Sequence, residues 1–425
     1  MSRNRRNVRR NTRIKEFLTS KNFFRIVSIL LAIIIVCIGI NLFRNNQERK
    51  ALAKQQEEIR AQSEEIFSQI SENIEETNKN ISESDVSIKI SAVGDILCSN
   101  EMLEDAYNEN DNSYDFSHMF NNVKNLVNVS DIVMGTLETS ITDNEYNDKN
   151  APIEFARAIR NSGVNLISIA NNHSLDNGIS GLNETKENLE EEGFTVVGDS
   201  TKDTDSVVIR EVKNSKIAIL SYTCFLDNEG QLGDDEINAV NIYSEEKAKE
   251  DIEYAEKEGA EYICVMIHWG DDGISETVSD EQKEIADFFV NNGVDLIIGS
   301  HPSCVQPIEI KQNSDGDTAF IAYSLGTYIS TLSEEEAKTE LVLNIELRKS
   351  GKDGKIYLNK VDYTPIYMLD NGDGEQNRFE LIDMKNTATS YTGDETDKIT
   401  KEVYDNLVNG LNRLNRILGI NNNVE

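Results

Sequence analysis

The chain has 425 residues with 42 basic and 76 acidic side chains, which give it a formal net charge of −34. Residues 61–425 alone carry 28 basic and 72 acidic side chains, a net of −44, because 14 basic and 4 acidic side chains lie in residues 1–60. A surface this negative repels nucleic acids, so the composition argues against nucleic-acid binding.

The N-terminal segment predicts a membrane anchor. Residues 1–25 carry nine basic side chains and a single acidic one, and residues 26–43 are apolar except for Ser28, Gly39 and Asn41. A helix of this length extends about 27 Å, close to the hydrocarbon thickness of a bilayer. The flanking charge predicts a single-pass signal anchor in the cell membrane, with a cytoplasmic N-terminus and an extracytoplasmic C-terminal domain.

A cleaved signal peptide is the alternative for this segment, because Ala51-Leu52-Ala53 resembles a cleavage site. Arg44, Arg49 and Lys50 separate that tripeptide from the apolar run, so a retained anchor fits better. Basic residues can also form a nucleic-acid-binding arm, but their position directly before the apolar run is already explained by membrane topology.

After the anchor, the chain is divided into a stalk and a folded domain. Residues 44–85 are polar, contain no Pro or Gly, and have isoleucines at helical spacing, which predicts a helical stalk. From residue 86 onward, segments typical of strands and of helices alternate, which predicts an α/β domain. We expect strands at 86–93, 130–134, 164–170, 193–197, 216–222, 261–267 and 294–298, and helices at 152–161, 178–192 and 279–292.

The C-terminal part of the domain has a different pattern. Expected strands at 305–310, 319–323, 340–347 and 355–365 follow one another without helices, which predicts a second, more antiparallel sheet packed on the first. Residues 370–395 are polar and loop-like, and residues 397–418 have the apolar spacing of an amphipathic helix.

Polar clusters follow the expected strands, and three of the four histidines lie in them. His173, His268 and His301 each come just after a buried strand, and Asp95 and Glu138 follow two others. The carboxyl ends of neighbouring strands meet at one edge of an α/β sheet, so these side chains should converge. Carboxylate, amide and imidazole together suit Mn²⁺, Fe²⁺ or Zn²⁺. A buried polar network around one structural histidine is the alternative.

An ordered set of motifs resembles the CapA-type poly-γ-glutamate capsule synthesis proteins, a branch of the calcineurin-like metallophosphoesterases. The motifs are residues 92–96 (Ala-Val-Gly-Asp-Ile), 136–139 (Thr-Leu-Glu-Thr), 170–178, 268–270 (His-Trp-Gly), 299–302 (Gly-Ser-His-Pro) and 323–326 (Tyr-Ser-Leu-Gly). The resemblance covers residues 86–366 and implies a four-layer α-β-β-α sandwich behind the N-terminal transmembrane helix. Residues 367–425 would then form a polar loop and a C-terminal amphipathic helix.

The resemblance also implies a ligand set. One metal would be held by Glu138, Asn172, His268 and His301. Asp95 matches a ligand of a second metal, but Leu97 and Ser303 stand where the superfamily has two further histidines. We therefore expect one tightly bound divalent ion. Two cysteines near the motifs, Cys98 and Cys304, are candidates for a substitute thiolate ligand.

Other residues are expected to act on the substrate. His173 matches the superfamily position that contacts the scissile phosphate and assists the leaving group. Asp271, Asp272 and Thr327 stand where the family usually has Glu, Tyr and Asn, and they are expected to line the substrate side of the pocket. Trp269 would either stack on a ligand or pack in the core. The remaining histidine, His118, fits a loop or a helix start.

The resemblance implies a membrane-anchored, extracytoplasmic protein of poly-γ-glutamate capsule synthesis or export. Other subunits of a polymer synthesis complex, and an anionic substrate or polymer bound through the metal, are the expected partners. One alternative is an active metal-dependent phosphoesterase that hydrolyses a cell-envelope substrate. Another is a non-catalytic scaffold with a structural metal. The sequence leaves open whether the protein is an enzyme.

Overall fold

The computed structural model describes residues 47, 49–58, 61, 85–127, 129–200, 206–271, 273–374, 377–393 and 399–418. The predicted cytoplasmic segment 1–25, the predicted anchor 26–43 and most of the predicted stalk 44–85 lie outside these residues. Residues 1–60 form a unit of their own, in which residues 49–58 are helical. Among the helices that the structure describes, none has the length and apolarity that crossing a membrane requires.

Two sheets form the centre of the unit that spans residues 61–425. The first sheet has the spatial order β18 (Phe379–Asp383), β17 (Ile356–Asp370), β16 (Thr339–Lys349), β1 (Val86–Ile96), β4 (Ile132–Leu137), β7 (Leu166–Ser168) and β8 (Thr195–Val197), and β15 (Thr327–Ile329) also pairs with β1. The second sheet has the order β13 (Ile308–Gln312), β14 (Thr318–Ala322), β12 (Leu296–Ser300), β11 (Tyr262–His268), β10 (Ser215–Thr223) and β9 (Val207–Val212).

Both sheets have a parallel centre, and this places their functional ends together. In the first sheet β1, β4, β7 and β8 are parallel, and β16 joins β1 in antiparallel fashion. In the second sheet β10, β11, β12 and β14 are parallel, with antiparallel β9 and β13 at its edges. The carboxyl ends of the parallel strands of each sheet therefore lie along one edge of that sheet.

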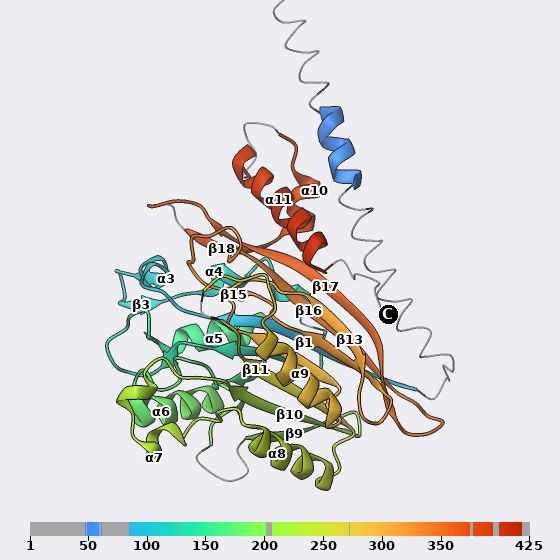
Figure 1. Ribbon diagram of the computed structural model, residues 1–425. Coiled ribbons are helices and arrows are strands. Elements are labelled where there is room, and N and C mark those ends of the chain that lie inside the picture. The colour runs from blue at the N-terminus through green and yellow to red at the C-terminus, as the bar shows by residue number, and fades with distance from the viewer. Residues whose placement is uncertain are drawn as a thin grey trace, which may run out of the picture. The chain divides into compact units, whose positions relative to one another are not determined.

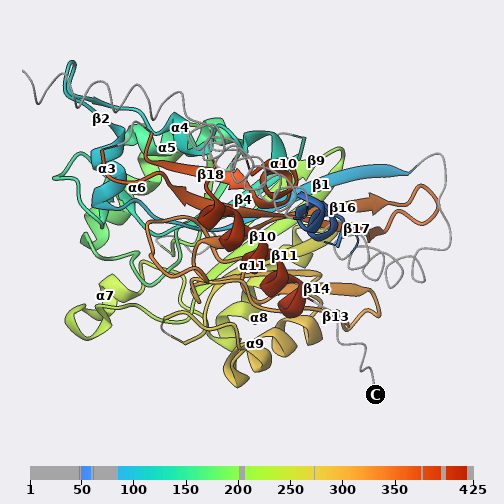
Figure 2. The same cartoon turned by 90° about the horizontal axis from the view of Figure 1, so that it is seen from above.

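Helices cover the outer faces of the two sheets, as Figures 1 and 2 show. The helices are α3 (Asn100–Ala106), α4 (Ser117–Phe120), α5 (Ile153–Ser162), α6 (Gly178–Glu191), α7 (Asp234–Ile237), α8 (Glu245–Lys257), α9 (Asp280–Asn291), α10 (Met384–Ser390) and α11 (Lys401–Leu418). Short elements are the strand pairs β2 (Tyr107–Asn108) with β3 (Ser113–Tyr114) and β5 (Ser140–Ile141) with β6 (Asn150–Ala151), and the 3-10 turns η1 (Lys124–Leu126) and η2 (Glu229–Gln231).

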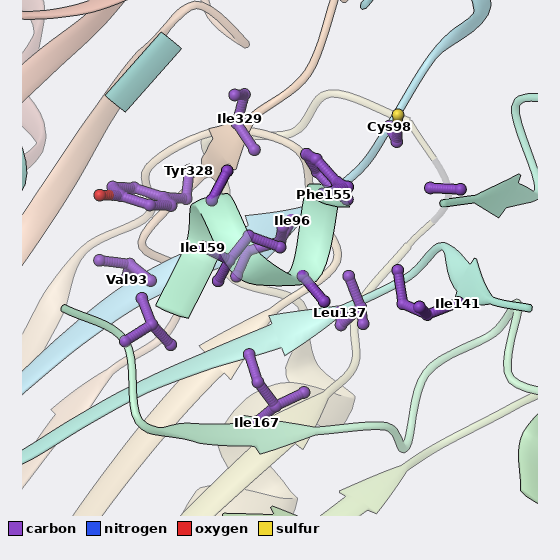
Figure 3. Packing of buried hydrophobic residues seen from close by; sticks show 14 of the residues in the cluster. Val93, Ile96, Cys98, Leu137, Ile141, Phe155, Ile159, Ile167, Tyr328 and Ile329 are labelled. Atoms are coloured by element: carbon purple, nitrogen blue, oxygen red, sulfur yellow. The ribbon is translucent and has the colours of Figure 1, made fainter. Parts of the chain in front are cut away.

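The outer core of the first sheet lies under α4, α5 and α6. Phe155 and Ile159 of α5 are buried together with Ile96 and Leu137, and Figure 3 shows these helix side chains over the strands. Burying an aliphatic or aromatic side chain of this size stabilises the fold by about 2 kcal/mol relative to leaving it exposed. This packing fixes β1 and β4, whose ends carry the first two predicted ligands.

Side chains alternate between the two faces of β11, and the two faces have different surroundings. Ile263, Val265 and Ile267 pack against α8 and α9 in the outer core of the second sheet. The alternate positions, which end with His268, therefore face the first sheet. Contacts between β1 and β12 and between β14 and β17 join the two sheets. The described residues thus form a mixed α/β fold with two sheets and helices on their outer faces.

The expectation for the C-terminal strands was wrong. Residues 305–310 and 319–323 were expected to share a sheet with residues 340–347 and 355–365. Instead β13 and β14 extend the second sheet, whereas β16 and β17 return to β1 in the first. Alternation in a strand specifies which face is buried but not which strand is its neighbour. The expectation also missed α8, although the helix has an N-cap at Ser244, whose side chain accepts from the Lys247 N–H. Residues 370–395, expected to be loop-like, contain β18 and α10.

Candidate metal centre

The predicted ligands occupy equivalent positions in the two sheets. Asp95 is the penultimate residue of β1, Glu138 directly follows β4, and Asn172 comes shortly after β7. His268 is the last residue of β11, and His301 directly follows β12. We call these five residues the donor cluster. The structure brings them together at the carboxyl ends of the strands, as the sequence pattern indicated.

Three donor atoms converge in the buried part of the cluster. Nε2 of His268 lies 2.8 Å from Oδ1 of Asn172 and 3.1 Å from Nδ1 of His301. The other ring nitrogen of His268, Nδ1, lies 2.9 Å from Oγ of Ser300. A hydroxyl at Nδ1 orients the ring so that Nε2 faces the other donors, which is the arrangement typical of a metal-binding histidine.

Two carboxylates complete the cluster. Asp95, Glu138 and His268 each offer a ligand atom within 4.8 Å of those of the other two. Burial works against ionisation of Asp95, but its contacts with His268 and His301 outweigh burial and lower the pKa of Asp95. Burial, and then the charge of Asp95, raise the pKa of Glu138 well above its usual range. The Asp95–Glu138 pair therefore favours a single negative charge, and a cation would favour the second ionisation.

His301 is held in an unusual backbone conformation. Its φ of +95° lies in the region that side chains other than glycine rarely adopt. The backbone N–H of His301 donates to Oδ2 of Asp95 across a distance of 2.8 Å. Strain of this kind costs about 1–3 kcal/mol and concentrates at functional sites. The contact joins the first sheet to the second within the cluster.

His173 lies next to the cluster and is partly exposed. Its Nδ1 is 2.9 Å from Oδ2 of Asp176 and 3.6 Å from Oδ2 of Asp227. Lys149 pairs with Asp176 at 3.0 Å, and this ion pair and His173 together lower the pKa of Asp176 against the effect of burial. A cavity of about 10 Å³, enough for one water molecule, is lined by Glu138 and His173 among others.

The residues that replace the second set of histidines offer the cluster little. Leu97 has no donor atom in its side chain, and its backbone N–H pairs with the carbonyl of Ile329. Ser303 donates its hydroxyl to the carbonyl of His301 at 3.2 Å. Of the expected second sphere, the structure thus retains Asp95 and the shared Glu138.

Two cysteines near the motifs are poor thiolate donors. Burial raises the pKa of the Cys98 thiol, and it raises that of Cys304 to about 11. The charged neighbours of Cys304 are Glu276, Arg413 and Glu336, none of which belongs to the donor cluster. Both cysteines are free thiols. A thiol that stays protonated at neutral pH is a weak metal ligand.

The residues expected to line the substrate side have different environments. Asp271 is exposed, Asp272 lies outside the described residues, and Thr327 is buried in register with Asp95 on the neighbouring strand. Trp269 belongs to the core, because it is buried, stacks on Tyr323 and donates its indole N–H to the Tyr323 carbonyl. His118 is the second residue of α4, at the helix start as expected, with Nε2 2.7 Å from Oδ2 of Asp105.

Sequence reasoning missed two residues of the site, Phe225 and Asp227. The ring centroid of Phe225 lies 4.7 Å from that of His301, edge to face. Asp227 accepts from Nδ2 of Asn172 at 3.0 Å. Both residues follow β10, at the same edge as the histidines. That position after a buried strand was the available signal, but no recognised motif marks it.

The residues present fit a divalent metal ion. The three converging donors are two imidazole nitrogens and an amide oxygen, and the adjacent carboxylates supply negative charge. Oδ1 of Asp95 is buried and accepts no hydrogen bond in the structure. This oxygen lies 3.6 Å from Nδ1 of His268, the ring nitrogen that faces Ser300. A desolvated carboxylate next to imidazole nitrogens suits a borderline first-row ion.

Two capsule biosynthesis proteins from Bacillus are similar to this chain over part of its length. Capsule biosynthesis protein CapA of Bacillus anthracis is 26% identical over 281 residues, which cover 62% of this chain and 65% of that protein. PGA biosynthesis protein CapA of Bacillus subtilis (strain 168) is 24% identical over 262 residues, which cover 57% of this chain and 64% of that protein. The chain thus spans just under two thirds of the length of these relatives.

Solved structures with partial similarity include a 5'-nucleotidase precursor from Thermus thermophilus, with a TM-score of 0.41, 11% identity and coverage of 70% of this chain and 54% of that one. Another is the calcineurin-like phosphoesterase YfkN from Bacillus subtilis, with a TM-score of 0.40, 13% identity and coverage of 77% and 99%. The sequence also matches the family described as Bacterial capsule synthesis protein PGA_cap over residues 89–332, which is more than half of the chain. This chain is therefore a member of the bacterial capsule synthesis PGA_cap family.

Proposed function

We propose that this protein acts in the synthesis or export of a capsule polymer, poly-γ-glutamate, through a divalent metal site formed by the donor cluster. Membership of the capsule synthesis family supports the biological context. The main observation in favour of a metal site is the position of His268 Nε2, which lies 2.8 Å from Asn172 Oδ1 and 3.1 Å from His301 Nδ1. Such a convergence of lone-pair atoms in a buried place is unfavourable unless a proton or a cation lies between them.

The proposed location is the outer side of the cell membrane. The basic residues 1–25 and the apolar residues 26–43 support a signal anchor with a cytoplasmic N-terminus. The folded domain would then work among the components of a polymer synthesis and export complex. The strongly negative charge of residues 61–425 means that an anionic polymer would approach the domain through a bound cation rather than unaided.

Glu138, Asn172, His268 and His301 would hold the ion, with Asp95 beside them. A Mn²⁺, Fe²⁺ or Zn²⁺ ion bound there would lower the pKa of a water molecule and neutralise an anionic substrate. His173 is placed to exchange a proton with such a substrate. Asp176 accepts the Nδ1 proton at 2.9 Å, so Nε2 is the unprotonated ring atom for that exchange, and it lies 3.3 Å from the amide nitrogen of Asn172. This chemistry suits the hydrolysis of a phosphoester.

The first experiment measures metal-dependent hydrolysis by the full-length protein in detergent. We expect Mn²⁺ to activate cleavage of bis(p-nitrophenyl) phosphate and His268→Ala to abolish both metal binding and cleavage. His118→Ala is the matched control, because that imidazole pairs with Asp105 outside the donor cluster. A folded wild-type protein that binds Mn²⁺ but cleaves nothing would exclude this phosphoester chemistry.

A second experiment addresses the capsule. Deletion of the gene should reduce surface poly-γ-glutamate, and the wild-type gene should restore it, whereas a His268→Ala copy should not. Unchanged polymer in the deletion strain would contradict the capsule role itself.

The second candidate is a non-catalytic component whose metal stabilises the fold. The engagement of the Ser303 hydroxyl with the His301 carbonyl, together with the apolar Leu97, favours this candidate, because a two-metal clamp on a substrate would be incomplete. A His173→Ala copy separates the two functions. Capsule restored by that copy supports a scaffold, and capsule lost supports catalysis.

A further inference from the structure

A segment without a recognised motif runs along the donor cluster. It comprises residues 224–228, which follow β10. The N–H of Cys224 donates to the carbonyl of His268 at 2.9 Å, and Phe225 packs its ring against His301. Farther along, Asn228 donates to the carbonyl of Leu175 at 3.0 Å. The segment is thus anchored at both ends on the chain that carries the candidate ligands.

Asp227, within this segment, contacts Asn172 through both its backbone and its side chain. Its backbone N–H donates to the carbonyl of Asn172 at 3.0 Å. Its Oδ1 accepts from the side-chain amide nitrogen of Asn172, also at 3.0 Å. The second carboxylate oxygen lies 3.6 Å from Nδ1 of His173, which Asp176 approaches more closely, at 2.9 Å. The stronger influence of Asp227 is therefore on Asn172.

The contact determines which end of the Asn172 amide faces the cluster. The Asp227 oxygen accepts from Asn172, so the amide nitrogen of Asn172 faces Asp227. The same nitrogen lies 3.3 Å from Nε2 of His173, a longer contact. The amide oxygen then points to Nε2 of His268, 2.8 Å away. A rotation of the amide by half a turn would place two oxygens together at Asp227 and would present an NH₂ group, which cannot bind a cation, to the imidazoles.

We propose that Asp227 is a positioning residue that fixes the Asn172 amide with its oxygen toward the imidazoles, in the orientation needed to bind a metal ion. The inference rests on the proposed metal site. It assigns a role to a residue whose side chain is 45% exposed and which composition alone would classify as one more surface acid. Partners that orient ligands in this way contribute about 10- to 100-fold to metal affinity.

The test measures Mn²⁺ affinity by electron paramagnetic resonance on full-length variants. Asp227→Ala removes the acceptor and should weaken Mn²⁺ binding about 10- to 100-fold. Asp227→Asn retains an oxygen that can accept from Asn172 and should stay close to the wild-type affinity. Asp235→Ala is the matched control, an exposed carboxylate from the same connection between β10 and α8. Wild-type affinity in Asp227→Ala would overturn the proposal, and so would an Asn variant as weak as the Ala variant.

A second measurement keeps the proposal separate from the metal site itself. If the wild-type protein binds no Mn²⁺, the proposed function fails, but the amide orientation is still measurable in metal-free protein by ¹⁵N NMR of labelled histidines. With the Asn172 oxygen at 2.8 Å, Nε2 of His268 carries a proton. We expect Asp227→Ala, but not Asp227→Asn, to shift this resonance. No shift in the Ala variant would overturn the positioning role.

Discussion

The first sheet supplies oxygen donors to the donor cluster through Asp95, Glu138 and Asn172, whereas the second sheet supplies nitrogen donors through His268 and His301. Neither sheet alone has the mixed set that a borderline divalent ion prefers. The cluster therefore exists only when the sheets are packed on each other. A bound ion would link the two sheets and stabilise the native protein over the unfolded chain.

The two sheets also position their donors in different ways. Asp95 is the penultimate residue of β1 and pairs with Thr136 of β4, after a shift in register between Ala92 and Asp95. His301 follows β12 with a φ of +95°, and its N–H reaches across to Asp95. The oxygen side of the cluster is therefore fixed by strand pairing, and the nitrogen side by a strained turn that the Asp95 contact stabilises.

The largest expected effect comes from adding a methyl group at two glycines that lie close to the backbone of other segments, one in each sheet. A Cβ at Gly94 would lie 1.9 Å from the Gly326 carbonyl oxygen, and one at Gly299 would lie 2.1 Å from that of Tyr323. Because backbone atoms must shift in both cases, we expect Gly94→Ala and Gly299→Ala each to lower the free energy of unfolding by about 3 kcal/mol. Chemical denaturation of the two variants measures this.

Gly230→Ala is the control for these two variants, since a Cβ there meets no heavy atom within 4 Å. We expect it to change the free energy of unfolding by no more than about 0.5 kcal/mol. If Gly94→Ala were as stable as this control, β1 and Gly326, the residue before β15, would not approach as closely as the structure indicates. If Gly299→Ala were as stable as the control, Gly299 of the second sheet and Tyr323 would not approach as closely as the structure indicates.

A smaller, pH-dependent effect is expected at the opposite edge of the second sheet, where strands begin. Oδ2 of Asp295 accepts from the N–H of Ile263, and Oδ1 accepts from Nδ2 of Asn313, both at 2.9 Å. Burial raises the pKa of Asp295 from 3.8 to about 7, and the charges of Asp317 and Asp315 add to this effect. The folded protein thus binds a proton that the unfolded chain has released between these two pH values.

The sign of the stability change follows from this linkage. Between about pH 4 and pH 7 the folded state binds more protons at Asp295 than the unfolded state, so this residue lowers the free energy of unfolding as the pH rises. Above about pH 7 its contribution is constant. We expect Asp295→Asn to lose a smaller share of its stability between pH 5 and pH 8 than the wild type does, measured by denaturation. An unchanged pH dependence in Asp295→Asn would show that Asp295 ionises normally.

Sequence patterns predicted which side chains lie close together at the strand ends, because strand periodicity has a direct structural meaning. The carboxyl end of a buried parallel strand lies at one edge of the sheet. A polar residue just after the strand must therefore lie at that edge. His268 and His301 were predicted on this basis, and the structure places their ring nitrogens 3.1 Å apart. Glu138 was predicted on the same basis, and the motif order then assigned Glu138 and Asn172 to the expected ligand set.

The contacts that could not be predicted depend on packing between distant segments. Asp227 is 55 residues from Asn172 in sequence, and an aspartate in a polar connection has many possible partners. The pairing of β16 with β1 rather than with β14 was missed for the same reason, because the alternation of a strand does not encode its neighbour. Strand ends are local features, whereas neighbours are decided by the whole fold.

A modest effect is expected from restoring a nitrogen donor that this chain lacks. Full-length wild-type protein should bind one Mn²⁺ tightly, because the second sphere retains only Asp95 and the shared Glu138 of the expected set. Ser303→His places an imidazole where the superfamily has one, and should raise occupancy from one toward two ions at saturating Mn²⁺. Ser303→Ala should remain at one ion. Two tightly bound ions in the wild type would contradict this assignment.

The smallest effect is expected at Cys304, which lies one residue beyond Ser303. A thiolate here would be the simplest rescue for the depleted second sphere, and the burial that raises the Cys304 pKa to about 11 works against it. Its charged neighbours are Glu276, Arg413 and Glu336 rather than Asp95 or Glu138. Cys304→Ser should therefore leave both the number of bound Mn²⁺ ions and their affinity unchanged, whereas His301→Ala, three residues earlier, should lower both. A loss of bound metal in Cys304→Ser would move this thiol into the donor cluster, and the second sheet would then contribute sulfur as well as nitrogen.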